Sequence, residues 1–286
     1  MKVLSLFDGM SCGQIALKKN KVKVDNYFAS EIKQHAIKCT QQNFPETIQI
    51  GDVRKVSFKD GILTTENGNF EVGKIDLLIG GSPCQDLSVL MRNREGLDGK
   101  KSSLFHEWLR IKNEVNPNYF LLENVASMSI NDKTKIDELL GVTGIFINST
   151  LFSAQLRKRY YWTNVNVDLN IDDKGIYLQS ILESGFTERK KSVCIVRNYA
   201  GSVQSSNKES FIRMCNARSK KGFLTEVYEE KDNPNSVRLF TQTELEKLQT
   251  VPKGYTSCLT FEESADLLGD GWTVDVICHI LKNMEV

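Results

Sequence analysis

The sequence is poor in the residues and patterns from which metal, disulfide and membrane proteins are built. Its 286 residues include three histidines at scattered positions, so we do not expect a histidine-based metal site. The seven cysteines are an odd number without a CxxC pair, which indicates free thiols in a reducing compartment. No apolar run approaches the roughly twenty residues of a membrane span. The first residues are too short a stretch for a signal peptide, and we expect a cytoplasmic protein.

A large excess of charge is also lacking, but the charge is unevenly distributed. The formal net charge is +1, whereas the stretch Arg189–Lys221 alone carries +8, with nine basic residues and only Glu209 opposing them. The remainder of the chain therefore carries −7. A solvated face is the simpler interpretation of such a run, but this one also contains several asparagines and a glutamine. We therefore predict a nucleic-acid-binding patch. The candidates for base contacts within it are Arg197, Arg213 and Arg218.

Apolar runs alternate with stretches of helical spacing in the first half of the chain. They predict strands at residues 2–7, 27–30, 75–80 and 119–123, and helices at 12–19, 33–42 and about 103–115. Such alternation predicts the α/β class, with a mostly parallel sheet and helices on both of its faces. Residues 60–73 predict a surface hairpin with Asn67-Gly68 as its turn. Past residue 165 we expect loops and short strands, followed by helices at 241–250, at 261–268 and after Trp272.

One cysteine differs from the other six in its position. The segment Gly80-Gly81-Ser82-Pro83-Cys84-Gln85 follows a buried strand, and its glycines and proline must end that strand. Cys84 is therefore predicted on a loop at the C-terminal end of a strand, the edge at which open α/β sheets bind ligands. A buried structural thiol is the commoner fate of a cysteine, but the loop position argues against it.

Two later segments bring ionisable groups toward the same edge. The strand at 119–122 ends in Glu123, and a third segment carries Arg157 and Arg159, which alternate along a predicted strand and should face one side. A thiol, a carboxyl and two guanidiniums suit a small planar ring such as cytosine. Cys84 would attack carbon 6, Glu123 would hold a proton for N3, and the arginines would bind the exocyclic oxygen and lower the pKa of the thiol.

In this setting the sequence resembles the DNA cytosine-5 methyltransferases, and most of all the catalytic domain of the vertebrate de novo enzymes. The resemblance covers roughly residues 3–165 and 236–282, and fails between about 166 and 235. Each motif alone is weak, but their ordered set is highly specific. The matching segments are Leu6–Gly9, Ser30–Ile32, Gly51–Arg54, Gly80–Ser88, Ser103–Phe105, Glu123–Val125, Gln155–Asn164 and Gly271–Val274. The resemblance implies the methyltransferase form of the Rossmann-like fold, in a small enzyme of prokaryotic or phage type without regulatory domains.

The resemblance implies S-adenosylmethionine as the cofactor. Glu31 ends the second strand, where a carboxylate can accept from both ribose hydroxyls, and Asp52 is expected to accept from the adenine amino group. Residues 7–13 do not form a GxGxxG pattern and alone would indicate an ordinary turn, while Trp272 is equally well explained as a core anchor. The cofactor-binding positions that the resemblance implies are Phe7, Asp8, Gly9, Glu31, Ile32, Asp52, Val53, Leu104 and Trp272.

The resemblance also implies a double-stranded DNA substrate. Because duplex DNA hides the target carbon, the cytosine must be flipped out, and Leu90 is at the family position that enters the vacated space. Ser88 and Gln155 are further expected DNA contacts, although Leu90 is nearly as well explained as a loop anchor and Gln155 as a tie between backbone segments. We expect a monomer with a catalytic and cofactor-binding domain at 1–182, completed by 256–286, and a target-recognition region at 183–255.

Two alternative functions stay open. A tRNA cytosine-5 methyltransferase would share the fold and the chemistry, but the Cys-Phe-Thr signature of that group is absent here. A non-catalytic DNA-binding relative would not need the intact Cys84, Glu123 and arginines. The sequence does not specify the recognition site, for which CpG is only suggested by the resemblance. It also does not specify a partner restriction enzyme or the base that removes the carbon-5 proton.

Overall fold

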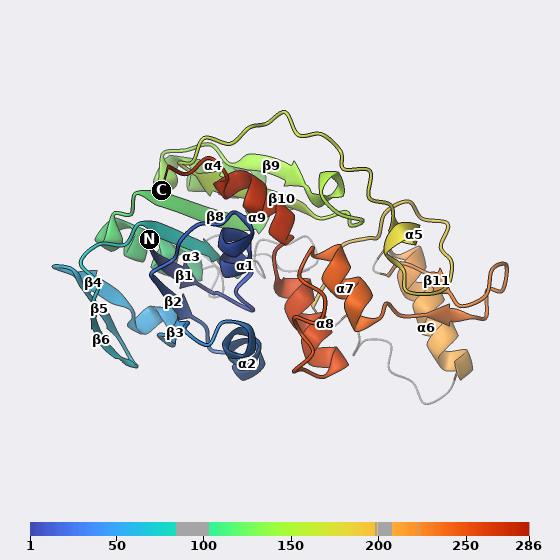
Figure 1. Ribbon diagram of the computed structural model, residues 1–286. Helices are drawn as coiled ribbons and strands as arrows, with labels where there is room; N and C mark the ends of the chain where they lie inside the picture. The colour runs from blue at the N-terminus through green and yellow to red at the C-terminus, as the bar shows by residue number, and fades with distance from the viewer. Residues whose placement is uncertain (84–102, 198, 200–207, 223, 286) are drawn as a thin grey trace. The chain divides into compact units, whose positions relative to one another are not determined.

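A computed structural model describes residues 1–83, 103–197, 199, 208–222 and 224–285 of the chain (Figure 1). The chain forms two compact units. The first comprises Met1–Ile147, Lys158–Asp168 and Cys278–Val286, and the second comprises Asn148–Arg157 and Leu169–Ile277. This division is based on contacts and assigns no function to either unit. The predicted division into a catalytic domain and a recognition region therefore stays a prediction. No helix in the described part of the chain is long and apolar enough to cross a membrane.

The first unit is built on a seven-stranded sheet with the order β3-β2-β1-β7-β8-β10-β9. Strands β1, β2, β3, β7 and β8 are parallel to one another, and β10 pairs antiparallel with β8. This arrangement confirms the predicted α/β class. The strands are β1 (Lys2–Leu6), β2 (Asn26–Ser30), β3 (Ile48–Gln49), β7 (Leu77–Gly81), β8 (Tyr119–Val125), β9 (Ile145–Asn148) and β10 (Lys158–Thr163).

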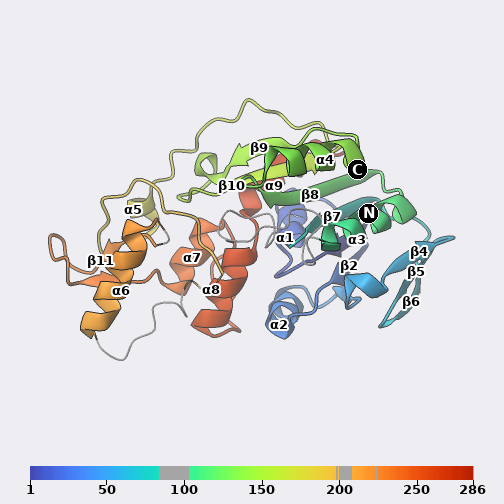
Figure 2. The same ribbon diagram turned by 180° about the vertical axis from the view of Figure 1, so that it is seen from behind.

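Helices lie on both faces of this sheet, as the alternation predicts. Helix α1 lies in front of the sheet in Figure 1, whereas α3 and α4 lie in front of it in the opposite view of Figure 2. The end of α9 returns to α1, since the Asn20 side chain donates a hydrogen bond of 2.8 Å to the Cys278 carbonyl oxygen. The helices are α1 (Cys12–Lys19), α2 (Gln34–Asn43), α3 (Ser103–Val115), α4 (Ile130–Leu140) and α9 (Val274–Leu281), of which α9 begins in the second unit.

The core of the first unit positions the end of β7, just before Cys84. Trp108 of α3 is completely buried against this strand. A Cβ atom at Gly80 would lie 2.7 Å from the Leu6 carbonyl oxygen and 2.8 Å from the Trp108 ring nitrogen, so only glycine permits this close approach. Each fully buried leucine of this core contributes about 1.5–3 kcal/mol of transfer free energy. Packing therefore holds the strand end in place.

A small antiparallel sheet is inserted between β3 and β7. It consists of β4 (Ser57–Lys59), β5 (Ile62–Thr65) and β6 (Gly68–Glu71). The predicted hairpin is confirmed, but its turn lies one residue earlier than expected. Thr65 pairs with Gly68, which leaves Glu66 and Asn67 at the tip. The Asn67 side chain donates a hydrogen bond of 2.9 Å to the Gln49 carbonyl oxygen, and this contact holds the tip beside β3.

Helices make up most of the regular secondary structure of the second unit. The helix predicted at 241–250 is confirmed as α7, which begins with a capping box in which Thr241 and Glu244 bind each other's backbone nitrogens. By contrast, α6 contradicts the expectation of loops and short strands. Its 13 residues form a helix in which polar and charged side chains outnumber apolar ones. The elements are α5 (Leu178–Ile181), α6 (Lys208–Lys220), β11 (Val227–Tyr228), β12 (Val237–Arg238), α7 (Gln242–Leu248) and α8 (Phe261–Asp270).

Candidate active site

The segment that leads to the candidate nucleophile is anchored between two strand ends. Cys84 itself lies outside the described residues, as do Ser88 and Leu90. The buried Ser82, two residues before Cys84, accepts a hydrogen bond of 3.1 Å on its hydroxyl from the side chain of Asn124 at the end of β8. The chain therefore leaves β7 beside the end of β8, the strand that carries Glu123.

Glu123 of β8 and Arg159 of β10 form a largely buried ion pair. The Arg159 Nε and Glu123 Oε1 atoms are 2.7 Å apart, and the two side chains are 13% and 11% exposed. The register explains the pair, because Arg159 lies opposite Val125 and Glu123 opposite Tyr161. Residues two positions apart project from the same face of a sheet, so the two side chains are diagonal neighbours. The geometry orients the carboxyl group by a charge-assisted hydrogen bond.

The expectation that Arg157 and Arg159 face the same side of one strand is wrong. Strand β10 begins only at Lys158, so Arg157 precedes it and belongs to the second unit. Its side chain is buried, and its guanidinium donates to the carbonyl oxygens of Ile195 at 3.2 Å, Gly269 at 3.1 Å and Gly271 at 2.7 Å. These contacts indicate an anchor between backbone segments, while a contact with substrate stays a prediction.

Gln155 is engaged in the same way. Its side chain is fully buried, donates to the Leu248 carbonyl oxygen at 3.2 Å and accepts from the Ile195 backbone nitrogen at 2.8 Å. These contacts correspond to the alternative interpretation of Gln155 as a tie between backbone segments. Its role as a DNA contact stays a prediction.

The predicted cofactor residues Phe7, Asp8 and Gly9 form a tight turn after β1. Phe7 and Gly9 have φ angles of 58° and 59°, in the left-handed region. The Asp8 carboxyl accepts a hydrogen bond of 2.8 Å from the Tyr27 hydroxyl and another from the Ser11 hydroxyl. Burial raises the pKa of Asp8 to about 6, and the hydrogen bond from Ser11 partly opposes this shift. The turn is therefore held by a carboxyl group whose pKa lies well above its usual value.

Glu31 connects this turn to the start of α2. Its carboxylate accepts backbone hydrogen bonds from Gly9 at 2.9 Å, Ile32 at 2.8 Å and Lys33 at 2.9 Å. A carboxylate has about four acceptor sites, so roughly one is left for a ligand. A contact with both ribose hydroxyls would need one of the backbone bonds to give way. Ile32 beside it is 63% exposed and presents an apolar surface on which a flat ring can stack.

Asp52 has an internal partner for its side chain. Both of its carboxylate oxygens accept from Arg54 Nε at 3.0 Å, and Arg54 Nη2 and the Arg54 backbone nitrogen bind them as well. The hydrogen bond with the Arg54 side chain holds the pKa of Asp52 below its usual value. A contact between Asp52 and the adenine amino group therefore has to compete with Arg54, and it stays a prediction.

The remaining predicted cofactor residues have different settings. Val53 is buried at the start of a short 3₁₀ helix (Val53–Lys55), and Leu104 is half-buried in the first turn of α3. Trp272 is half-buried in the second unit, two residues before α9.

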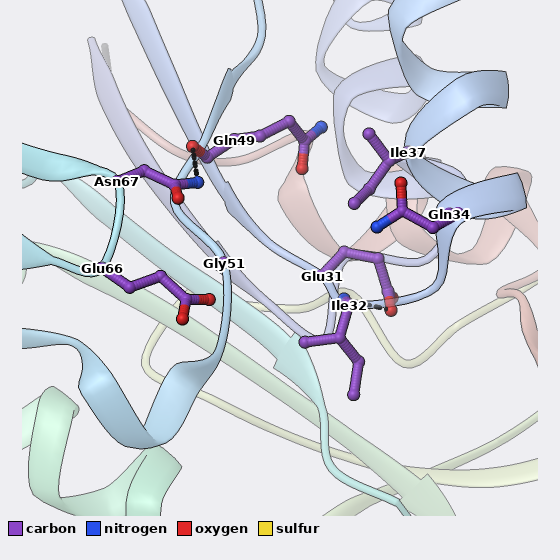
Figure 3. Close-up of a pocket in the computed structure, with 8 residues that line it drawn as sticks. All are labelled: Glu31, Ile32, Gln34, Ile37, Gln49, Gly51, Glu66 and Asn67. Carbon is purple, nitrogen blue, oxygen red and sulfur yellow. Dashed lines mark hydrogen bonds between the residues drawn. The ribbon is translucent and has the colours of Figure 1, made fainter.

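A cavity of about 260 Å³ opens beside Glu31 and Ile32 (Figure 3). Six of its eight lining residues were not predicted from the sequence. The sequence did contain a signal for two of them. The hairpin with Asn67-Gly68 is inserted shortly after Asp52, so its tip, with Glu66 and Asn67, could be expected near the predicted cofactor residues. The lining residues are Glu31, Ile32, Gln34, Ile37, Gln49, Gly51, Glu66 and Asn67.

In the basic stretch Arg189–Lys221, some side chains are exposed and others bind neighbouring protein groups. Arg213 of α6 is exposed and Arg218 is half-buried, while Arg197 is exposed with its Nε 3.8 Å from Asp266 Oδ2. Lys191 Nζ donates to the carbonyl oxygens of Thr150 at 2.7 Å, Ser153 at 3.0 Å and Ile176 at 2.7 Å. Burial lowers the pKa of Lys191. These contacts indicate that Lys191 anchors backbone segments of the second unit.

Similarity to known proteins agrees with this architecture. Solved structures with a similar fold include the Entamoeba histolytica methyltransferase EhMeth, with a TM-score of 0.71 and 15% identity over 99% of this chain and 97% of that one. Another is the S. pombe Dnmt2 methyltransferase, with a TM-score of 0.65 and 18% identity over 98% of this chain and 97% of that one. At these identities the likeness shows the fold alone.

Sequence relatives are found among bacterial and phage methyltransferases. The orphan methyltransferase M.Rho11sI of Bacillus phage rho11s is 31% identical over 188 residues, which cover 62% of this chain and 35% of the relative. The type II methyltransferase M.NgoBV of Neisseria gonorrhoeae is 30% identical over 210 residues, covering 65% of this chain and 47% of the relative. The matches therefore span between about a third and a half of these relatives. Residues 1–211 match the family model for C-5 cytosine-specific DNA methylases, and the chain belongs to this family.

Proposed function

We propose that the protein transfers a methyl group from S-adenosylmethionine to carbon 5 of cytosine in double-stranded DNA. The observation that carries this proposal is the buried Glu123–Arg159 ion pair, at the end of the strand next to the one that leads to Cys84. The family match over residues 1–211 supports the same chemistry. Residues of the first unit that fit the cofactor are the Glu31 carboxylate and the exposed Ile32 beside the cavity.

The residues divide the chemistry between nucleophile and proton donor. The Cys84 thiolate forms a bond to carbon 6 of the cytosine, and the electron pair displaced from the ring double bond makes carbon 5 nucleophilic. Glu123 donates a proton to N3 as that nitrogen becomes more basic, and Arg159 holds the carboxyl group in place. S-adenosylmethionine supplies the electrophilic methyl group. A base then takes the proton from carbon 5, the carbon–sulfur bond breaks, and N3 returns its proton.

The second unit is proposed to recognise the DNA. The exposed Arg213 and Arg197 and the half-buried Arg218 are candidates for base contacts, and the exposed Lys190, Lys220 and Lys221 for phosphate contacts. The target base leaves the duplex before reaction, because carbon 6 is inaccessible to a thiolate inside the stack.

The test is formation of a covalent adduct with duplex DNA that contains 5-fluorocytosine. Fluorine cannot leave carbon 5 as a proton does, so the carbon–sulfur bond persists and the protein–DNA species survives denaturing electrophoresis. Wild type should form it only with S-adenosylmethionine present, and Cys84→Ser should not form it, because a hydroxyl supplies almost no nucleophile at neutral pH. A tRNA carrying the same base is the comparison substrate, and an adduct with tRNA alone would contradict the DNA assignment.

A further inference from the structure

The turn between β1 and α1 has a backbone conformation that ordinary residues rarely adopt. Phe7, Gly9 and Ser11 have φ angles of 58°, 59° and 58°, in the left-handed region, and two of them are not glycine. Such residues keep this conformation only where several neighbouring contacts hold them in it. Ser11 occupies the N-cap position of α1, yet its hydroxyl does not cap the helix and donates to the Asp8 carboxyl instead. The shape of the turn therefore depends on the contacts of Asp8.

Side chains from two further elements hold the turn from outside. Tyr27 of β2 is 3% exposed, and its hydroxyl donates a hydrogen bond of 2.8 Å to Asp8 Oδ1, while the Ser11 hydroxyl binds Oδ2. The Thr40 hydroxyl of α2 lies 3.4 Å from the Gly9 carbonyl oxygen and 3.3 Å from the Ser11 hydroxyl oxygen. The Asp8 carboxyl group thus connects the turn to β2 by one oxygen and to the start of α1 by the other.

The same turn supports Glu31, the residue that is expected to bind the cofactor ribose. The Gly9 backbone nitrogen donates a hydrogen bond of 2.9 Å to Glu31 Oε2. The Asp8 backbone nitrogen donates one of 3.1 Å to the carbonyl oxygen of Ser30, the residue before Glu31. A displacement of the turn would therefore displace the Glu31 carboxylate. The contacts form a continuous path from Tyr27 through Asp8 and Gly9 to Glu31.

We propose that Tyr27 is a positioning residue of the cofactor site, which holds the turn and Glu31 in place through the ionised carboxyl group of Asp8. An ionised carboxyl accepts on both oxygens, so it can bind the hydroxyls of Tyr27 and Ser11 at the same time. After protonation one oxygen carries a hydrogen atom that needs an acceptor of its own, and the contacts have to rearrange. The inference rests on S-adenosylmethionine being the cofactor, as proposed above.

Protonation of Asp8 should therefore weaken cofactor binding. Burial raises the pKa of this carboxyl to about 6, hydrogen bonds from Ser11, Ser5 and Tyr27 oppose the shift, and the charge of Glu31 adds to it. Its ionisable neighbours among the described residues are thus Tyr27 on β2 and Glu31 just after β2. Affinity should be fully present above this pKa and should be lost as pH falls through it. Removing the Tyr27 hydroxyl takes a hydrogen bond from the ionised form, so it should move this loss to higher pH.

The test is calorimetric titration with S-adenosylmethionine between pH 5 and 8. Asparagine presents one acceptor and one donor, as a protonated carboxyl does. Asp8→Asn should therefore bind roughly tenfold more weakly than wild type at pH 8 and equally well at pH 5. The titration of the ligand itself is the same for both proteins and cancels in this ratio. In Tyr27→Phe the midpoint of the pH profile should shift upward by about one pH unit, because a hydrogen bond to a charged group favours the ionised form by roughly tenfold.

Tyr119→Phe is the matched control. It removes a hydroxyl that is hydrogen-bonded to the backbone of Glu285, at the start of β8 and thus at the opposite edge of the same sheet. This variant should keep the wild-type midpoint. Ser11→Ala removes the other donor to Asp8 and should shift the midpoint in the same direction as Tyr27→Phe, so it takes the place of a variant that does not fold.

The outcomes separate the inference from the proposed function. An equal loss of affinity at every pH in Tyr27→Phe would show a merely structural role, and it would overturn the inference. A ratio between wild type and Asp8→Asn that does not change with pH would overturn it as well. Both results leave the cofactor assignment intact. If wild type bound no S-adenosylmethionine at any pH, the proposed function itself would fail, and the inference with it.

Discussion

Arg157 and Arg159 are two residues apart, yet they lie in different units and have different kinds of partner. Arg159 in the first unit binds the carboxylate of Glu123, whereas Arg157 in the second unit binds three backbone carbonyl oxygens. A guanidinium beside a carboxylate orients a group that can hold a proton. A guanidinium surrounded by carbonyl groups holds loop segments together, because it donates to backbone oxygens that would otherwise be buried without a hydrogen bond. The comparison shows that spacing alone does not assign the same role to both arginines.

The largest effect is expected on the Arg159 side of this comparison. Glu123→Gln removes the proton that N3 needs, so the rate of methyl transfer to duplex DNA should fall by about 10²- to 10⁴-fold. The measurement is a single-turnover assay with labelled S-adenosylmethionine. Cofactor affinity serves as the control and should stay close to wild type. A rate within a factor of three of wild type would show that the ion pair is structural, like the contacts of Arg157.

Arg157→Met should act mainly on stability. It leaves the carbonyl oxygens of Ile195, Gly269 and Gly271 without this donor, and we expect a loss of about 2–3 kcal/mol in the free energy of unfolding. Urea denaturation monitored by tryptophan fluorescence measures it. Arg157→Lys should recover only part of the loss, because one ammonium group cannot reproduce the planar fork of donors. Unchanged stability with lost activity would place Arg157 beside Arg159 in function after all.

Two aspartates of the first unit also differ in their surroundings, and their pKa values shift in opposite directions. Asp8 has a pKa raised to about 6 by burial, while the hydrogen bond from Arg54 lowers the pKa of Asp52. Between pH 4 and 6 the folded state keeps the Asp8 proton that the unfolded state loses. This contribution to stability therefore falls as pH rises, by about 1–2 kcal/mol after allowance for partial exposure. Asp8→Asn should remove it. Unfolding curves at pH 4, 5, 6 and 7 check the difference, and parallel profiles for the two proteins would contradict the assignment.

The smallest effect concerns two neighbouring lysines. Lys190 is exposed, whereas Lys191 binds three backbone carbonyl oxygens. Lys190→Gln should therefore make the slope of log K against log salt for DNA binding shallower by roughly 0.9, the contribution of one phosphate contact. Lys191→Gln should leave the slope unchanged and lower stability instead. Anisotropy titrations at several salt concentrations separate the two, and equal slopes for both variants would remove the distinction.

Local pattern alone predicted much of the fold. Alternating apolar runs and helical spacing predict the α/β sheet, Asn67-Gly68 predicts the hairpin to within one residue, and the helix predicted at 241–250 corresponds to α7. Glu123 lies near the end of a buried strand, which continues two residues beyond the predicted end to Val125. These features depend on neighbours within a few residues, so they can be read directly from the chain. The weakly apolar helix α6 escaped prediction because its sequence shows little of the periodicity that packing normally imposes.

The arrangement of the site was decided only by tertiary structure. The antiparallel register of β8 and β10 makes Glu123 a diagonal neighbour of Arg159, and a shift by one residue would turn one of them to the opposite face. The carbonyls that hold Arg157 come from segments about 40 and more than 100 residues further along the chain. The tip of the hairpin lies across a cavity from Glu31, 35 residues earlier in sequence. Sequence therefore determined which chemical groups stand at the strand ends. Packing between distant segments decided which of them meet, because it sets register and burial.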